Sequence, residues 1–173
     1  MNERTYIDPR CTREGWPSHE WDGEPDKVEW RDADTGLPCI AKRQPTSGHW
    51  CGYVGVPPGH QYHGKDYGDV YSADPDIEVH GGLTFADECQ EGPPEEAICH
   101  VPEPGEPDHV WWLGFDCHHA WDLAPSDFLW RDRHGWPIDH DKVYRNLPYV
   151  RSECRYLARQ IARGPVNGDE RHG

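Results

Sequence analysis

The sequence lacks any long apolar run. Hydrophobic residues make up 35% of its 173 residues, and no segment approaches the roughly 20 apolar residues of a membrane-spanning helix. The opening stretch, MNERTYIDPR, also lacks the apolar centre of a secretory signal. We therefore expect a cytoplasmic protein with no membrane partner.

Basic charge is scarce as well. Lys and Arg number 17 against 32 Asp and Glu, which gives a net charge of −15. A chain of this charge is repelled by a phosphate backbone, so duplex nucleic acid is excluded as a partner. The acids are scattered among Trp, Pro and Gly, which argues against a protein mimic of nucleic acid.

Several motifs of known chemistry are also missing. There is no C-x-x-C pair, G-x-S-x-G elbow, H-E-x-x-H helix or G-x-G-x-x-G loop. A phosphate-binding loop is not completed either, because Lys65 is followed by Asp66. In the reducing compartment expected here, most cysteines should be free, small and buried. They are Cys11, Cys39, Cys51, Cys89, Cys99, Cys117 and Cys154.

Glycine and proline are abundant, with 18 and 17 residues. They interrupt regular elements often, so short strands and many turns are expected. We predict an α+β fold with a mostly antiparallel central sheet, one C-terminal helix and extensive Gly/Pro-rich loops. The strands should lie around residues 28–32, 37–43, 50–56, 77–80 and 110–115, the first two forming a hairpin.

The predicted domain organisation is simple. Residues 1–27 form an extended lead-in, residues 28–163 a single globular domain and residues 164–173 a disordered tail. The segment YVRSECRYLARQIARG predicts the C-terminal helix, because its apolar residues recur at helical spacing and Gly164 ends it. A stripe of arginines beside that face either pairs with the chain's own acids or holds a partner. A further helical turn is expected near residues 124–132, with Ser126 or Asp127 as its N-cap.

The stretch WWLGFDCHHAWDLAP places polar groups directly after an apolar strand. Asp116, His119 and Asp122 are three residues apart, which puts them on one face if a helical turn follows. Such side chains suit Zn²⁺, Mn²⁺ or Fe²⁺, and they equally suit a metal-free acid–base pair. We favour His119 over His118, because its neighbours at three residues on either side are acids. The structural alternative is an Asp116 cap with surface histidines.

A second segment, VHGGLT, closes another predicted strand on a histidine. His80 ends the alternating run, and Gly81 and Gly82 leave backbone N–H groups open to an anion or carbonyl. Thr84 adds a hydroxyl. We predict that His80 joins Asp116, His119 and Asp122 as metal ligands or catalytic groups, with the other three residues binding substrate.

A third segment, CGYVGVPPGHQYHGKDY, has the composition of a ligand-binding lid. Tyr53 can stack on a ligand, while His60, His63 and Lys65 can bind phosphate. The plain alternative is an exposed, histidine-rich loop.

Several of these segments resemble those of one protein family. CGYVGVPPGH, VHGGLTFA and WWLGFDCHHAWDLAP, followed by YRNLPYVRSECRYLARQI, are similar to a family of uncharacterised proteins from actinobacteria and their phages. The resemblance covers roughly Trp50 to Ala162. It implies a phage or mobile-element setting, where small acidic proteins bind or destroy host signalling nucleotides, but it implies no reaction.

Three functions remain open from the sequence. The first is a small soluble hydrolase, with Zn or another divalent transition metal as a cofactor, acting on a phosphate-containing or nucleotide-like substrate. The second is a non-catalytic protein that sequesters such a ligand or blocks a host protein. The third is a structural or accessory phage protein.

Overall fold

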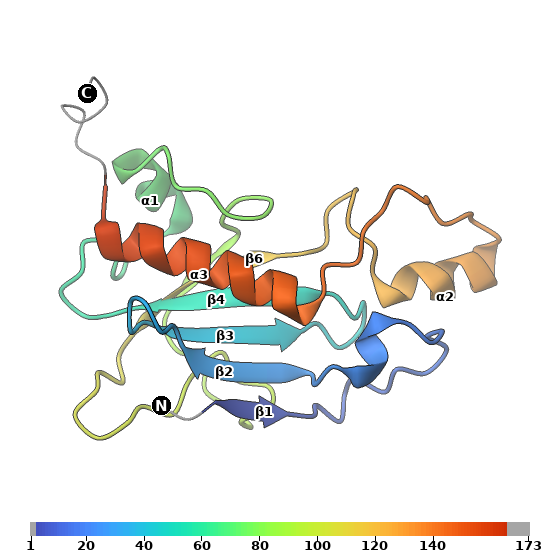
Figure 1. The fold of residues 1–173 in the computed structure, drawn as a ribbon, viewed down its shortest axis with the longest axis horizontal. Coiled ribbons are helices and arrows are strands. Elements are labelled where there is room, and N and C mark those ends of the chain that lie inside the picture. Colours follow the sequence, from blue (N-terminus) through green and yellow to red (C-terminus); the bar gives the residue numbers. More distant parts are fainter. Residues whose placement is uncertain (1–2, 166–173) are drawn as a thin grey trace.

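The computed structural model describes residues 3–165, and its centre is a six-stranded antiparallel sheet (Figure 1). The strands are β1 (Arg4–Tyr6), β2 (Lys27–Arg31), β3 (Pro38–Arg43), β4 (Trp50–Val56), β5 (Phe85–Asp87) and β6 (Trp111–Asp116). Their order across the sheet is β1-β2-β3-β4-β6-β5. The α+β class and the antiparallel sheet are confirmed, as is the hairpin of β2 and β3.

One face of the sheet is covered by the C-terminal helix α3 (Leu147–Arg163), which packs on β4 and β3 (Figure 1). The predicted apolar positions of this helix, Val150, Cys154, Leu157 and Ile161, are all buried in the main core. Gly52 of β4 permits the close approach, because a Cβ there would lie 2.8 Å from the Cys154 sulfur. The helix ends at Gly164, as its sequence predicts.

The opposite face of the sheet is covered by the long loop between β5 and β6. Ile98 and Val110 of this loop pack on Ile40, Tyr53 and Trp112 in a second, smaller core. Both faces are therefore buried, and alternate strand residues point into different cores.

Within that loop, Cys89 and Cys99 form a disulfide. The sequence did not predict this pairing, because only their spacing of ten residues distinguishes these two cysteines from the others. The other five cysteines are free; Cys51 is half-buried and the rest are buried.

The N-terminal segment is built into the domain rather than leading up to it. It contributes β1 and a short 3-10 helix, η1 (Glu20–Gly23), whose Trp21 is buried in the main core. Buried Asp26 then joins Arg43 through an ion pair of 3.2 Å between Oδ1 and Nε. Most of the predicted tail, residues 166–173, lies outside the described residues.

The predicted strand at residues 77–80 does not form. In its place, the Gln160 side chain of α3 bonds the backbone of Glu78, accepting from its N–H at 2.8 Å and donating to its carbonyl at 2.6 Å. The alternating pattern instead reflects Ile77 and Val79 packing into the core from an irregular segment. A helix side chain thus supplies the hydrogen bonds that a neighbouring strand would have supplied.

Two further helices flank the sheet. Helix α1 (Tyr67–Ala73), capped by Asp66, begins at the last residue of the segment predicted as a lid. Helix α2 (Pro125–His134) is the predicted helical turn extended to ten residues, and its N-cap is Ala124 rather than Ser126 or Asp127. Asp127 instead accepts the Ala124 N–H at 3.0 Å from inside the first turn. Within the described part of the chain, no helix is long and apolar enough to cross a membrane.

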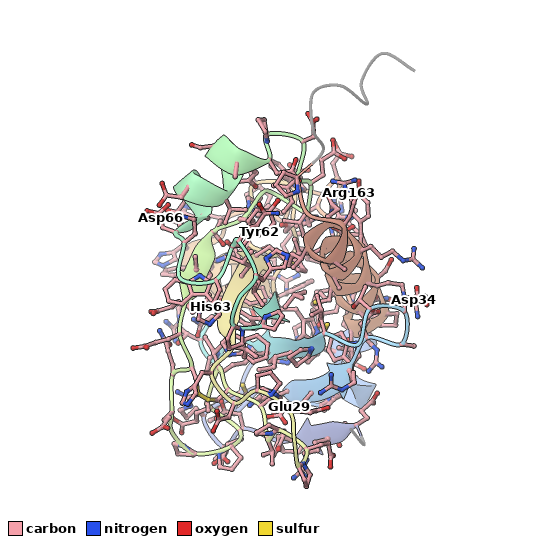
Figure 2. The ribbon with its side chains drawn as sticks, turned by 90° about the vertical axis from the view of Figure 1, so that its left-hand side faces the viewer. Glu29, Asp34, Tyr62, His63, Asp66 and Arg163 are labelled. Atoms are coloured by element: carbon pink, nitrogen blue, oxygen red, sulfur yellow. A yellow bond between two sulfur atoms is a disulfide. The ribbon has the colours of Figure 1, made fainter. Side chains whose placement is uncertain are left out.

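The arginine stripe on α3 pairs with acids of the chain itself. Each of its four arginines lies beside a different carboxylate. The pairs are Arg151–Glu3, Arg155–Asp32, Arg159–Asp34 and Arg163–Asp74. Figure 2 shows Asp34 on the β2–β3 turn beside α3.

Candidate functional site

Two irregular segments meet beside the N-terminal end of α3. The first, between α1 and β5, carries His80, and the second, between β6 and α2, carries His119 and Asp122. His80 Nε2 lies 2.9 Å from Asp122 Oδ2, and His119 Nδ1 lies 3.0 Å from the same oxygen. One carboxylate oxygen is therefore shared by two imidazoles, which joins the two predicted halves of the site.

Asp122 is fully buried at the centre of this cluster. Burial opposes its ionisation, but hydrogen bonds from His80, the His119 N–H and Arg145 outweigh burial and lower the pKa of the carboxyl to about 2. The Arg145 contact, 3.0 Å from Nε to Oδ1, occupies the oxygen that the histidines leave free. Asp122 is thus an ionised carboxylate whose two oxygens face different partners.

His80 is held on both sides of its ring. Its Nδ1 lies 2.7 Å from the Tyr149 hydroxyl, opposite the bond from Nε2 to Asp122. Its backbone N–H donates to Glu153 Oε2 at 2.9 Å, which fastens the segment to α3. The side chain is only 5% exposed, so this ring is fixed and nearly dry.

His119 is the more open of the two histidines, with 20% of its side chain exposed. Trp121 stacks on the ring at 4.9 Å between centroids. Gly81 lies against its other edge: a Cβ at that position would be 2.2 Å from His119 Nε2. No described residue hydrogen-bonds to Nε2, whereas Asp122 fixes Nδ1.

The three side chains can hold a metal ion. One potential ligand atom from each of His80, His119 and Asp122 lies within 4.8 Å of the others. Among residues 3–165, this is the one group of three or more His, Cys, Asp or Glu side chains that meets that condition. Two imidazoles and a carboxylate are donors that zinc and other divalent transition metals accept.

Asp116 does not belong to this group. The chain leaves β6 in irregular turns rather than a helix, so the spacing of three residues does not place Asp116 and His119 on one face. Asp116 Oδ1 instead accepts the His118 N–H at 3.0 Å, and Oδ2 accepts the Thr84 hydroxyl at 3.1 Å. Asp116 is therefore the cap of the structural alternative, while the cluster next to it is the candidate site.

The predicted substrate residues near His80 have structural contacts. Thr84 binds Asp116, and the Gly82 N–H donates to the Val79 carbonyl at 2.9 Å rather than remaining open to an anion. Gly81 and Gly82 adopt positive φ angles of 66° and 85°, which glycine tolerates best. Both glycines turn the chain, and Gly81 also leaves room for the His119 ring.

The predicted lid lies at the other end of the sheet. β4 has seven residues, so its two ends are about 20 Å apart. Val56, after which the loop begins, pairs with Trp111 at the start of β6, whereas Cys51 pairs with Asp116 at its end. Figure 2 views the molecule from the lid end, where Tyr62, His63 and Asp66 are labelled.

Contacts within the lid segment are structural. His60 Nε2 bonds the Ile161 carbonyl at 2.8 Å, and His63 Nε2 bonds the His109 carbonyl at 2.7 Å. The Lys65 carbonyl accepts the Trp111 indole N–H. Tyr53 is buried in the smaller core, where burial holds the pKa of its hydroxyl well above the usual range. None of these four residues reaches the cluster at Asp122.

Sequence reasoning missed the residues that support the cluster. Tyr149 and Glu153 lie four apart at the start of α3, so a shared helical face was detectable, but their partner was not. Arg145 and Trp121 carry no comparable signal. Their positions depend on how two irregular segments fold against the helix.

The fold and the cluster together define an α+β protein with a candidate metal centre of two histidines and one aspartate. Comparisons of the chain with models of protein families, with curated proteins and with solved structures found no match.

Proposed function

We propose that this protein is a small hydrolase whose catalytic centre is a divalent transition metal held by His80, His119 and Asp122. The observation that carries the proposal is the convergence of both imidazoles on one buried carboxylate oxygen. The two nitrogens lie 2.9 and 3.0 Å from this oxygen, against about 3.3 Å for two atoms that share a tetrahedral zinc ion. Three protein ligands leave a fourth position for water, as in catalytic rather than structural zinc sites.

The surrounding contacts favour a metal site over a simple ion pair. Metal-bound histidines are usually oriented by a hydrogen bond at their second nitrogen, and Tyr149 provides that contact to His80. Arg145 orients Asp122 in the same way, through the oxygen that does not face the histidines. A bound divalent ion would supply a water of lowered pKa as the nucleophile.

The residues of the chain have distinct roles in this proposal. His80 is nearly buried and serves as a fixed ligand. His119 is more open, so it and Trp121 border the space that a substrate would enter. A phosphate-containing or nucleotide-like substrate remains our proposal, although the predicted lid cannot hold it at this centre.

Metal content of the purified protein tests the proposal, with no metal added to the buffers. Wild type should contain close to one equivalent of zinc, manganese or iron. His119→Ala should lose it, with little change in melting temperature because the ring is partly exposed. His118→Ala is the matched control: this neighbouring histidine stacks on His49 and should leave metal content unchanged.

Three outcomes would contradict the proposal. Absence of metal from wild type would favour a metal-free binding protein that sequesters its ligand. Equal loss in both variants would mean that the loop, rather than the ligand, is required. Unfolding of His119→Ala would assign a structural role to the cluster.

A further inference from the structure

A groove of about 540 Å³ lies between the first half of α3 and the β2–β3 turn. Its charged lining consists of Arg31, Arg151 and Arg155 together with one acid, Asp32. A chain with a net charge of −15 therefore gathers three guanidinium groups around one depression. The groove is thus rich in positive side chains although the molecule as a whole is negative, which suggests that these arginines have a local function.

Asp32 makes no hydrogen bond to the arginines of the groove. Its Oδ2 accepts the backbone N–H of Thr35 at 2.9 Å and the hydroxyl of the same residue at 2.8 Å. The carboxylate is 2% exposed and is turned into the hairpin turn that it caps. Its other oxygen lies 3.8 Å from Arg155 Nε, which is longer than a hydrogen bond.

The arginines of the groove already bind carboxylates that come from outside it. Arg151 Nη2 lies 2.7 Å from the exposed Glu3 carboxylate, and Arg31 pairs with Glu106 of the long loop. Arg31 Nε is buried and has no hydrogen-bond partner among the described residues. The guanidinium groups of Arg31 and Arg151 thus already bind carboxylates, which shows that this part of the surface accepts anionic groups.

Two features orient the charge. Arg151 lies over the Trp30 ring at 4.6 Å, which fixes its guanidinium plane. The positive end of the α3 dipole adds to the field. The first N–H groups of α3 are not free, since Leu147 donates to Glu24 and Tyr149 donates to Asn146. The arginines, not the helix end, are therefore the anion-binding groups.

We propose that this groove binds a phosphate group, either free inorganic phosphate or the phosphate of a nucleotide. Phosphate matches the groove because several guanidinium forks can each donate to a different oxygen of one group. The proposal is independent of the metal centre. Tyr149 and Glu153 face that centre, whereas Arg151 and Arg155 line the groove on another side of the same helix.

The test is to titrate the protein with inorganic phosphate at low ionic strength and to measure the dissociation constant by calorimetry. Arg155→Gln should weaken binding by at least about tenfold, because it removes a charge-assisted donor. Arg159→Gln is the matched control: it lies one turn further along α3, is equally exposed at 57%, and pairs with Asp34 outside the groove. It should change affinity by less than about twofold. Both arginines are exposed, so both variants should fold, and their melting temperatures check this.

Equal weakening in the two variants would overturn the proposal, because it would indicate a diffuse field rather than a site. Failure of wild type to bind phosphate at about 10 mM would also overturn it. Adenosine and adenosine monophosphate identify the source of the group. Tighter binding of the monophosphate than of phosphate, with none of adenosine, assigns a nucleotide, and equal binding of monophosphate and phosphate assigns the phosphate group alone. Binding of adenosine as tightly as its monophosphate would contradict the proposal.

Discussion

Both ends of the sheet carry histidines, but these histidines have different partners. At the end near α2, His80 and His119 share the buried carboxylate of Asp122. At the lid end, His60 and His63 bond backbone carbonyls. A carbonyl fixes a ring in place, whereas an ionised carboxylate between two rings forms a donor set for a cation. The number of histidines in a segment is therefore a poorer guide to a site than the presence of a carboxylate that meets them.

The largest effect is expected at His49, which lies at the same end as the candidate metal centre but is not one of its three residues. Burial, together with repulsion from His118, lowers its pKa from 6.5 to about 4. As the pH falls from 6.5 toward 4, the unfolded chain gains a proton here that the folded chain does not. The free energy of unfolding should therefore fall over this range by up to about 3 kcal/mol, with no effect above it.

His49→Gln should remove this part of the pH dependence, as measured by urea unfolding at pH 7 and at pH 4.5. The exposed His140→Gln serves as the control and should leave the decline as in wild type. An unchanged decline in His49→Gln would show that this histidine is not held neutral.

A smaller effect is expected from the tyrosine that orients His80 in the candidate metal centre. Comparing two tyrosines of α3 separates this role from a general effect on the helix. Tyr149→Phe removes the hydroxyl on His80 Nδ1 and should lower metal affinity about 10- to 100-fold, measured by competition with a chelator. Tyr156→Phe is the matched control on the same helix, because its hydroxyl binds Glu78 instead. If metal affinity falls equally in both variants, the contact between the Tyr149 hydroxyl and His80 has no specific role in metal binding.

The smallest effect is expected at the lid end. His60→Ala removes two hydrogen bonds, one between Nε2 and the Ile161 carbonyl and one from the Tyr62 N–H to Nδ1. It should cost about 1–2 kcal/mol of unfolding free energy. Metal content should remain that of wild type, measured on the same preparation. Loss of metal from this variant would show that histidines at both ends of the sheet affect metal binding, which would contradict the comparison.

Much of the fold follows from local patterns in the sequence. The hairpin of β2 and β3, the strands β4 and β6, and the apolar face of α3 were predicted, because each depends on residues that are near neighbours in the chain. Strand 77–80 was wrong because Gln160, 82 residues away from Glu78, replaces the neighbouring strand. The disulfide in the loop between β5 and β6 likewise depends on how that loop closes.

The candidate site was predicted in part. The sequence indicated His80, His119 and Asp122, because each follows an apolar run and lies beside polar residues. Asp116 was grouped with them on the assumption of a helical turn that does not form. The predicted lid does not reach these residues, because in the antiparallel pair of β4 and β6 Val56 lies beside Trp111 and Cys51 lies beside Asp116.

The most direct test of the metal centre is X-ray absorption at the edge of the metal that the purified protein contains. For zinc, the account predicts only nitrogen and oxygen ligands at about 2.0–2.2 Å, with the signature of two imidazoles. A sulfur ligand at about 2.3 Å would contradict it, because that would place the metal on a cysteine such as Cys117 rather than on His80, His119 and Asp122.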